Sequence, residues 1–109
     1  MRQSGVIASA GIYALENNIE RLSEDHKRAS AFAEAIDSMK PFSVNLETVQ
    51  SNIVFIGVEK GSTKRKIEEL SKNGVKILDT DDSTIRAVFH HHITDEDVKN
   101  AIDAFSKVK

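Results

Sequence analysis

The chain has 109 residues, of which 39% are hydrophobic and 29% charged, with a single proline. This length and composition fit one globular domain with an apolar core, and exclude a second full domain or a disordered chain. The 15 Lys and Arg residues against 17 Asp and Glu give a formal net charge of -2. Nucleic-acid binding usually requires a surplus of positive charge, so we expect no nucleic-acid partner. The absence of cysteine excludes disulfides, thiolate metal sites and thiol nucleophiles.

No membrane span or secretion signal is expected either. No stretch approaches the roughly 20 apolar residues of a membrane-spanning helix. The small-residue run from Val6 to Ala10 lacks a long apolar core and a clear cleavage site. We therefore expect a cytoplasmic protein with no membrane partner.

The first 40 residues are predicted to be helical. Apolar residues recur at helical spacing from residue 4 to about residue 39, as one long helix or two in line. Asn17 and Asn18 form the weak point, and the helix should end before Pro41. Its first third, residues 6–11, is rich in small side chains, which allow another backbone to approach closely. We expect that part to pack against protein outside this sequence.

Residues 41–109 are predicted to form strand, helix, strand, strand and helix. A helix is expected from Gly61 to about Lys72, ended by Asn73 and Gly74, with the basic residues 64–66 on a solvated face. The expected strands are 53–56, 75–78 and 84–90, and residues 42–46 could add a short edge strand.

The start of the last helix has the strongest local signal. Thr94 and Asp97 form a variant capping box, and Ile93 can pack against Val98 as a hydrophobic staple. The complete order of elements predicts an α+β domain, 1–109, with an antiparallel sheet and helices packed on one face.

Arg86 is the leading candidate for binding a ligand. It lies in the middle of an expected strand, on the same face as Val88 and His90, whereas Ile85, Ala87 and Phe89 share the other face. A guanidinium can bind a carboxylate through two parallel hydrogen bonds. The alternative is an arginine on an exposed face with its head group in water.

Other polar clusters are weaker candidates. His90, His91 and His92 suggest a metal, but strand alternation separates them and no further ligand has a recognisable spacing, so no metal site is expected. Glu24, Asp25 and His26 point in different directions on a helix, which favours an ordinary helix surface.

Several motifs in order resemble low-specificity L-threonine aldolases. They are Met1-Arg2-Gln3-Ser4-Gly5, Ala14-Leu15-Glu16, Arg21-Leu22, Glu24-Asp25-His26, Val49-Gln50-Ser51-Asn52-Ile53-Val54, Arg86-Ala87-Val88-Phe89-His90 and Thr94. The resemblance spans nearly all 109 residues. It implies the small C-terminal domain of a fold-type-I enzyme that uses pyridoxal 5'-phosphate to cleave β-hydroxy amino acids such as threonine into glycine and an aldehyde.

The resemblance also implies roles for two arginines. Arg86 falls where the family places the arginine that binds the substrate carboxylate, and Arg2 where an arginine reaches the cofactor phosphate, across a subunit interface in some arrangements. The Schiff-base lysine would lie upstream of Met1, because no lysine here matches its motif. The resemblance therefore implies a missing N-terminal cofactor-binding domain, an amino-acid substrate, a homotetramer, and no activity for the isolated fragment.

Some residues depart from the family pattern. Ala87 and Phe89 replace a usual leucine and threonine, Ser51 replaces a threonine, and His91-His92 is atypical, which leaves the substrate preference open. The alternative from another class is a freestanding ferredoxin-like module that binds a small molecule or regulates a partner. A zinc-binding protein using residues 90–92 is a third, weaker hypothesis.

Overall fold

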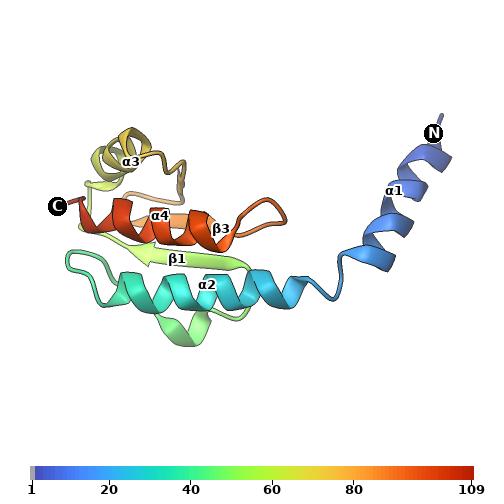
Figure 1. Ribbon diagram of the computed structural model, residues 1–109. Helices are drawn as coiled ribbons and strands as arrows, with labels where there is room; N and C mark the ends of the chain where they lie inside the picture. Colours follow the sequence, from blue (N-terminus) through green and yellow to red (C-terminus); the bar gives the residue numbers. More distant parts are fainter. Residues whose placement is uncertain (1) are drawn as a thin grey trace.

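The computed structural model describes residues 2–109 and confirms an α+β domain with an antiparallel sheet. The predicted N-terminal helix is two helices, α1 (Ser4–Asn17) and α2 (Leu22–Asp37). They are not in line: α1 leaves the body of the domain at a steep angle to α2 (Figure 1). None of the residues of α1 is buried.

The break falls at the predicted weak point. The side-chain amide of Asn17 donates a hydrogen bond to the carbonyl oxygen of Tyr13 at 2.9 Å, and the backbone N–H of Asn18 closes the last turn onto Ala14 at 2.8 Å. Asparagine side chains compete in this way with the helical backbone. The chain then turns through residues 18–21 before α2 begins.

The sheet has three antiparallel strands in the order β1-β3-β2: β1 (Ile53–Gly57), β2 (Leu78–Asp79) and β3 (Thr84–Val88). The central strand is therefore β3, and Arg86 at its middle pairs with Phe55 on one side and Leu78 on the other. This arrangement places Arg86 between two apolar neighbours on the same face of the sheet.

Three predicted strands differ from the structure, and β3 ends at Val88 and not at residue 90. Instead of an edge strand at 42–46 there is one bridge between Ser43 and Gly57, followed by a 3-10 helix, η1 (Leu46–Thr48). The backbone N–H of Val44 bonds to the side chain of Asp37 at 2.9 Å and not to a neighbouring strand. The expected strand at 75–78 pairs only from residue 78, because the N–H of Val75 closes the end of the preceding helix onto Leu70.

The core lies between the sheet and two helices. The helix α2 and α4 (Asp95–Ser106) pack against each other, and α2 also contacts β1. The inward-facing sheet residues Val54, Ile56 and Ile85 are fully buried. The helix α3 (Thr63–Lys72) lies beside β2 and contributes Leu70 to the core.

The predicted capping box of α4 is confirmed, whereas the predicted solvated position of Lys66 is wrong. The capping box at α4 is present as expected, since the hydroxyl of Thr94 accepts from the N–H of Asp97 at 3.2 Å and the Asp97 carboxylate accepts in return at 2.8 Å. Lys66, which was expected on a solvated face, is instead 1% exposed, with its ammonium 5.1 Å from the centre of the Phe42 ring. The long stem of lysine packs well against apolar surface, which allows this burial.

Candidate functional site

Arg86 lies on the face of the sheet opposite the helices. Its neighbours in the strand alternate as predicted: Ile85 is fully buried and Phe89 is 5% exposed, whereas Arg86 and Val88 are exposed. The face around Arg86 is apolar, because Phe55, Leu78 and Val88 show 45%, 64% and 44% of their surface. The guanidinium is therefore the positive centre of an exposed apolar patch.

The guanidinium of Arg86 has no internal anion. Within residues 2–109, no carboxylate lies within 4.0 Å of this guanidinium, whereas Arg21, Arg28 and Arg65 each form an ion pair. An arginine in apolar surroundings binds a carboxylate strongly when the anion is supplied from outside. An exposed Arg86 is also what the alternative interpretation expects, so its ligand-binding role stays a prediction.

Arg2 lies far from Arg86. It precedes Gln3, the N-cap residue of α1, and the N-terminal end of α1 is the part most distant from the sheet (Figure 1). Gln3 has a left-handed backbone, with φ of 58°, and makes no side-chain cap, and the first turn holds no acidic residue. The first N–H groups of α1 are thus available to an anion beside Arg2. The two arginines do not form one site within a single chain.

The three histidines follow β3 in a turn. The rings of His90 and His92 are 5.9 Å apart and those of His91 and His92 are 5.1 Å apart, because the strand ends at Val88 and alternation no longer separates them. The backbone N–H of His92 donates to the ring nitrogen Nδ1 of His90 at 3.3 Å. In the part of the chain that the structure describes, no three His, Asp or Glu residues are placed to hold a metal ion.

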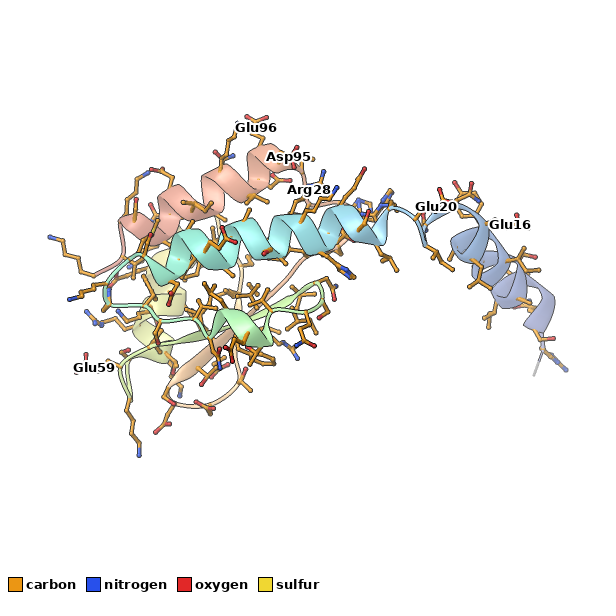
Figure 2. All side chains as sticks on the ribbon, turned by 90° about the horizontal axis from the view of Figure 1, so that it is seen from below. Glu16, Glu20, Arg28, Glu59, Asp95 and Glu96 are labelled. Atoms are coloured by element: carbon orange, nitrogen blue, oxygen red, sulfur yellow. The ribbon has the colours of Figure 1, made fainter. Side chains whose placement is uncertain are left out.

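Asp25 is the polar residue that sequence reasoning misplaced. It is 2% exposed and not part of an ordinary helix surface, and its carboxylate accepts a hydrogen bond from Arg21 at 2.8 Å. Arg28 lies 3.9 Å from the same oxygen and bonds Asp95 of α4 at 2.7 Å (Figure 2). That hydrogen bond to Asp95 raises the pKa of Arg28. The sequence signal for this ion pairing was the spacing of Arg21, four residues before Asp25, and Arg28, three residues after it, because residues three or four apart are neighbours on a helix.

The chain matches a known protein family. The family model described as beta-eliminating lyase matches residues 1–59, which is more than half of the chain. The chain therefore belongs to the beta-eliminating lyase family, a family of lyase enzymes.

Similar curated proteins narrow the likeness. The chain is 38% identical over 110 residues to the low-specificity L-threonine aldolase 1 of Arabidopsis thaliana, covering 98% of the chain and 31% of that protein. It is 32% identical to the probable low-specificity L-threonine aldolase 2 of the same plant, covering 99% of the chain and 31% of that protein. The low specificity L-threonine aldolase of Escherichia coli K12 is 43% identical over 58 residues, which cover 53% of the chain and 16% of that protein. The chain thus spans about a third of the length of the plant relatives.

No helix among residues 2–109 is long and apolar enough to cross a membrane.

Proposed function

We propose that the chain is the C-terminal domain of a pyridoxal-phosphate-dependent threonine aldolase. The observation that carries the proposal is the match over 98% of the chain to about a third of a plant threonine aldolase. The complete enzyme would cleave L-threonine or L-allo-threonine to glycine and acetaldehyde. It would act in the cytoplasm as a homotetramer, with an N-terminal domain holding the cofactor.

In this proposal Arg86 binds the substrate carboxylate. The unpaired guanidinium and the apolar ring of Phe55, Leu78 and Val88 support it, since this face can be covered by the cofactor domain. Covering the face excludes water, and a charge-assisted pair gains strength in a drier site. Arg86 would orient the substrate by its carboxylate and would not itself transfer a proton.

Arg2 would bind the phosphate of the cofactor. The exposed guanidinium next to the uncapped start of α1 fits a phosphate group, because both supply N–H donors and positive charge. Since Arg2 lies far from Arg86, the two arginines would serve different groups, and Arg2 can serve a neighbouring subunit. Pyridoxal phosphate supplies the electron sink for breaking the carbon–carbon bond.

The isolated chain should have no aldolase activity. None of the ten lysines in the chain matches the Schiff-base motif. The substrate-binding arginine alone cannot break the carbon–carbon bond of the substrate. The proposal therefore requires that activity appear only when a cofactor domain is joined to the chain.

A chimera tests the proposal. Residues 2–109 would replace the matching third of the Arabidopsis threonine aldolase 1, and glycine formation from L-threonine would be followed. We expect the chimera to cleave threonine and the isolated chain not to. A chimera that is folded by circular dichroism and binds the cofactor, yet has no activity, would contradict the proposal.

The role of Arg86 is tested within the same chimera. Arg86→Ala should raise KM for L-threonine by roughly ten- to a hundredfold, because a hydrogen bond to a charged group is worth about 1.5–3 kcal/mol. Arg86→Lys should recover part of the loss. Arg65→Ala, on a helix surface with 58% of its side chain exposed, is the matched control and should leave KM unchanged. An unchanged KM in Arg86→Ala would remove the assignment.

A further inference from the structure

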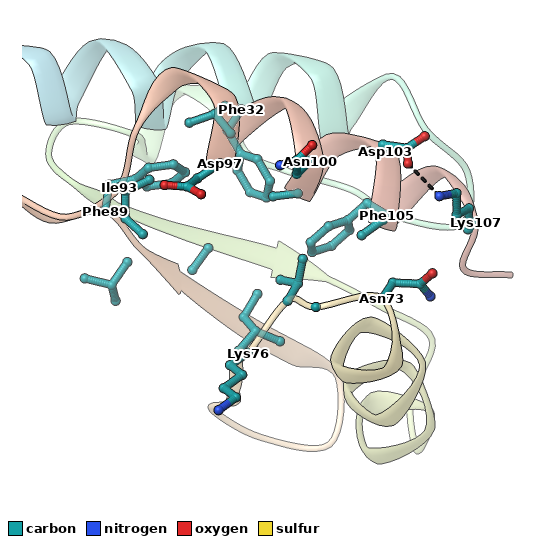
Figure 3. A pocket seen from close by; sticks show the side chains of 18 residues that line it. Phe32, Asn73, Lys76, Phe89, Ile93, Asp97, Asn100, Asp103, Phe105 and Lys107 are labelled. Atoms are coloured by element: carbon teal, nitrogen blue, oxygen red, sulfur yellow. Dashed lines mark hydrogen bonds and ion pairs between the residues drawn. The ribbon is translucent and has the colours of Figure 1, made fainter.

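A cleft opens on the face of β3 opposite Arg86. It lies between α4 and the segment 73–77, and its volume is about 550 Å³ (Figure 3). That volume is within the range of small-molecule sites, roughly 300–1,000 Å³. The predicted strand at 75–78 would have closed this space, and the cleft is open because residues 75–77, before Leu78, do not pair with β3.

The bottom of the cleft is aromatic. Phe32 lies edge to face with both Phe89 and Phe105, each with ring centres 5.4 Å apart, and all three line the cleft. The walls are apolar side chains that are only partly buried: Val75, Ile77, Ala87, Ile93 and Ala101. A planar aromatic molecule can extend this edge-to-face cluster and cover the partly exposed walls.

One wall carries unpaired backbone groups. The N–H of Phe89 donates a hydrogen bond to the carbonyl oxygen of Asn52, just before β1, at 2.8 Å. Backbone groups of successive strand residues point to opposite sides, so the N–H and C=O of Val88 point towards β2. There the next partner in register would be Lys76, but no hydrogen bond joins Val88 and Lys76 in the described chain. Val88 lines the cleft, so one donor and one acceptor are available to a ligand.

The charged groups at the rim are already paired or turned away. Asp97 is held by the cap at Thr94, and this hydrogen bonding lowers its pKa. Asp103 is bonded to Lys107 at 2.6 Å, and Lys76 points away from α4 (Figure 3). Among the described lining residues, each charged side chain is hydrogen-bonded within α4 and its cap or points away from α4, so the arrangement favours a neutral ligand.

We propose that this cleft is a binding site for a small neutral aromatic molecule that bears one hydrogen-bonding N–H or C=O group. The ring packs on the partly exposed side chains of Ala87 and Ala101, beside the buried rings of Phe32, Phe89 and Phe105, and the polar group bonds the free backbone edge at Val88. Because side chains alternate across a strand, the ligand lies on the other face of the sheet from Arg86. Binding here is therefore independent of the proposed carboxylate site.

Indole is a suitable probe, since it combines an aromatic ring with one N–H donor. Titration of the isotope-labelled 109-residue chain, followed by amide chemical shifts, should give saturable shifts at Ala87, Val88 and Ala101. Benzoate and benzylammonium should bind more weakly than indole, because the site has no free charge of either sign. Shifts that do not saturate, or that centre on other residues, would overturn the proposal.

Filling the cleft supplies the matched comparison. Ala87→Leu adds three carbon atoms in the space of the ring, and should weaken indole binding by roughly tenfold or more. Ala31→Leu makes the same addition on the exposed surface of α2 and should leave binding unchanged. If Ala87→Leu does not fold, Ala101→Leu on α4 tests the same space. Equal indole affinity in a folded cleft-filling variant and in Ala31→Leu would refute the site.

Discussion

Replacing Asp25 by asparagine should destabilise the domain although it keeps the shape of the side chain. The Asp25 carboxylate is 2% exposed and bonds Arg21 at 2.8 Å, with Arg28 at 3.9 Å. Removing one partner of a buried ion pair costs about 3–5 kcal/mol. The side chain of Arg21 is 18% exposed and regains some water, and Arg28 keeps Asp95. We therefore expect a smaller loss, about 2 kcal/mol.

Urea unfolding of the 109-residue chain, followed by circular dichroism, measures this loss directly. A loss of about 2 kcal/mol corresponds to a fall in melting temperature of roughly 10 °C for a domain of this size. The matched control is Glu24→Gln, because the side chain of Glu24 is 59% exposed and 3.7 Å from Arg28. That control should cost less than about 0.5 kcal/mol. Equal effects of the two substitutions would refute the reasoning.

Three further predictions concern stability. Burial lowers the pKa of Lys66 from its ordinary value of 10.5, so the unfolded chain binds more protons than the folded chain and the free energy of unfolding rises as the pH rises towards 10.5. Lys66→Met should be more stable than wild type by about 1 kcal/mol at neutral pH. If urea titrations show that this difference does not shrink as the pH approaches 10.5, the prediction is contradicted. Thr94→Ala should cost about 1 kcal/mol by removing the cap of α4, and a melting temperature equal to wild type would show that the cap is not needed. Deleting residues 1–18 should leave the melting temperature of the remaining domain nearly unchanged, because α1 buries no residue; a large fall would show that α1 supports the core.

Much of the fold follows from local patterns. The cap of α4, the end of α3 at Gly74 with its φ of 86°, and the alternation along β3 depend on residues close in sequence. Short-range hydrogen bonds and the periodicity of helices and strands decide such features, so the amino-acid sequence is enough to predict them. The same periodicity placed Arg86 on the outer face of the sheet.

The remaining features depend on residues that meet only after folding. Asp25 is buried because α2 packs on α4, where Arg28 bonds Asp95, a residue 67 positions away. Lys66 is buried because Phe42, from the segment after α2, lies under its ammonium. The cleft exists because residues 75–77 do not reach β3.

The sequence by itself therefore determined the class of fold, the end of α3, the start of α4 and Arg86 as the candidate ligand contact. Only the tertiary structure decided that Arg2 lies far from Arg86 and that none of the described residues of α1 is buried (Figure 1). The physical reason is that burial and ion pairing are set by long-range packing, and no local pattern specifies which distant surfaces meet.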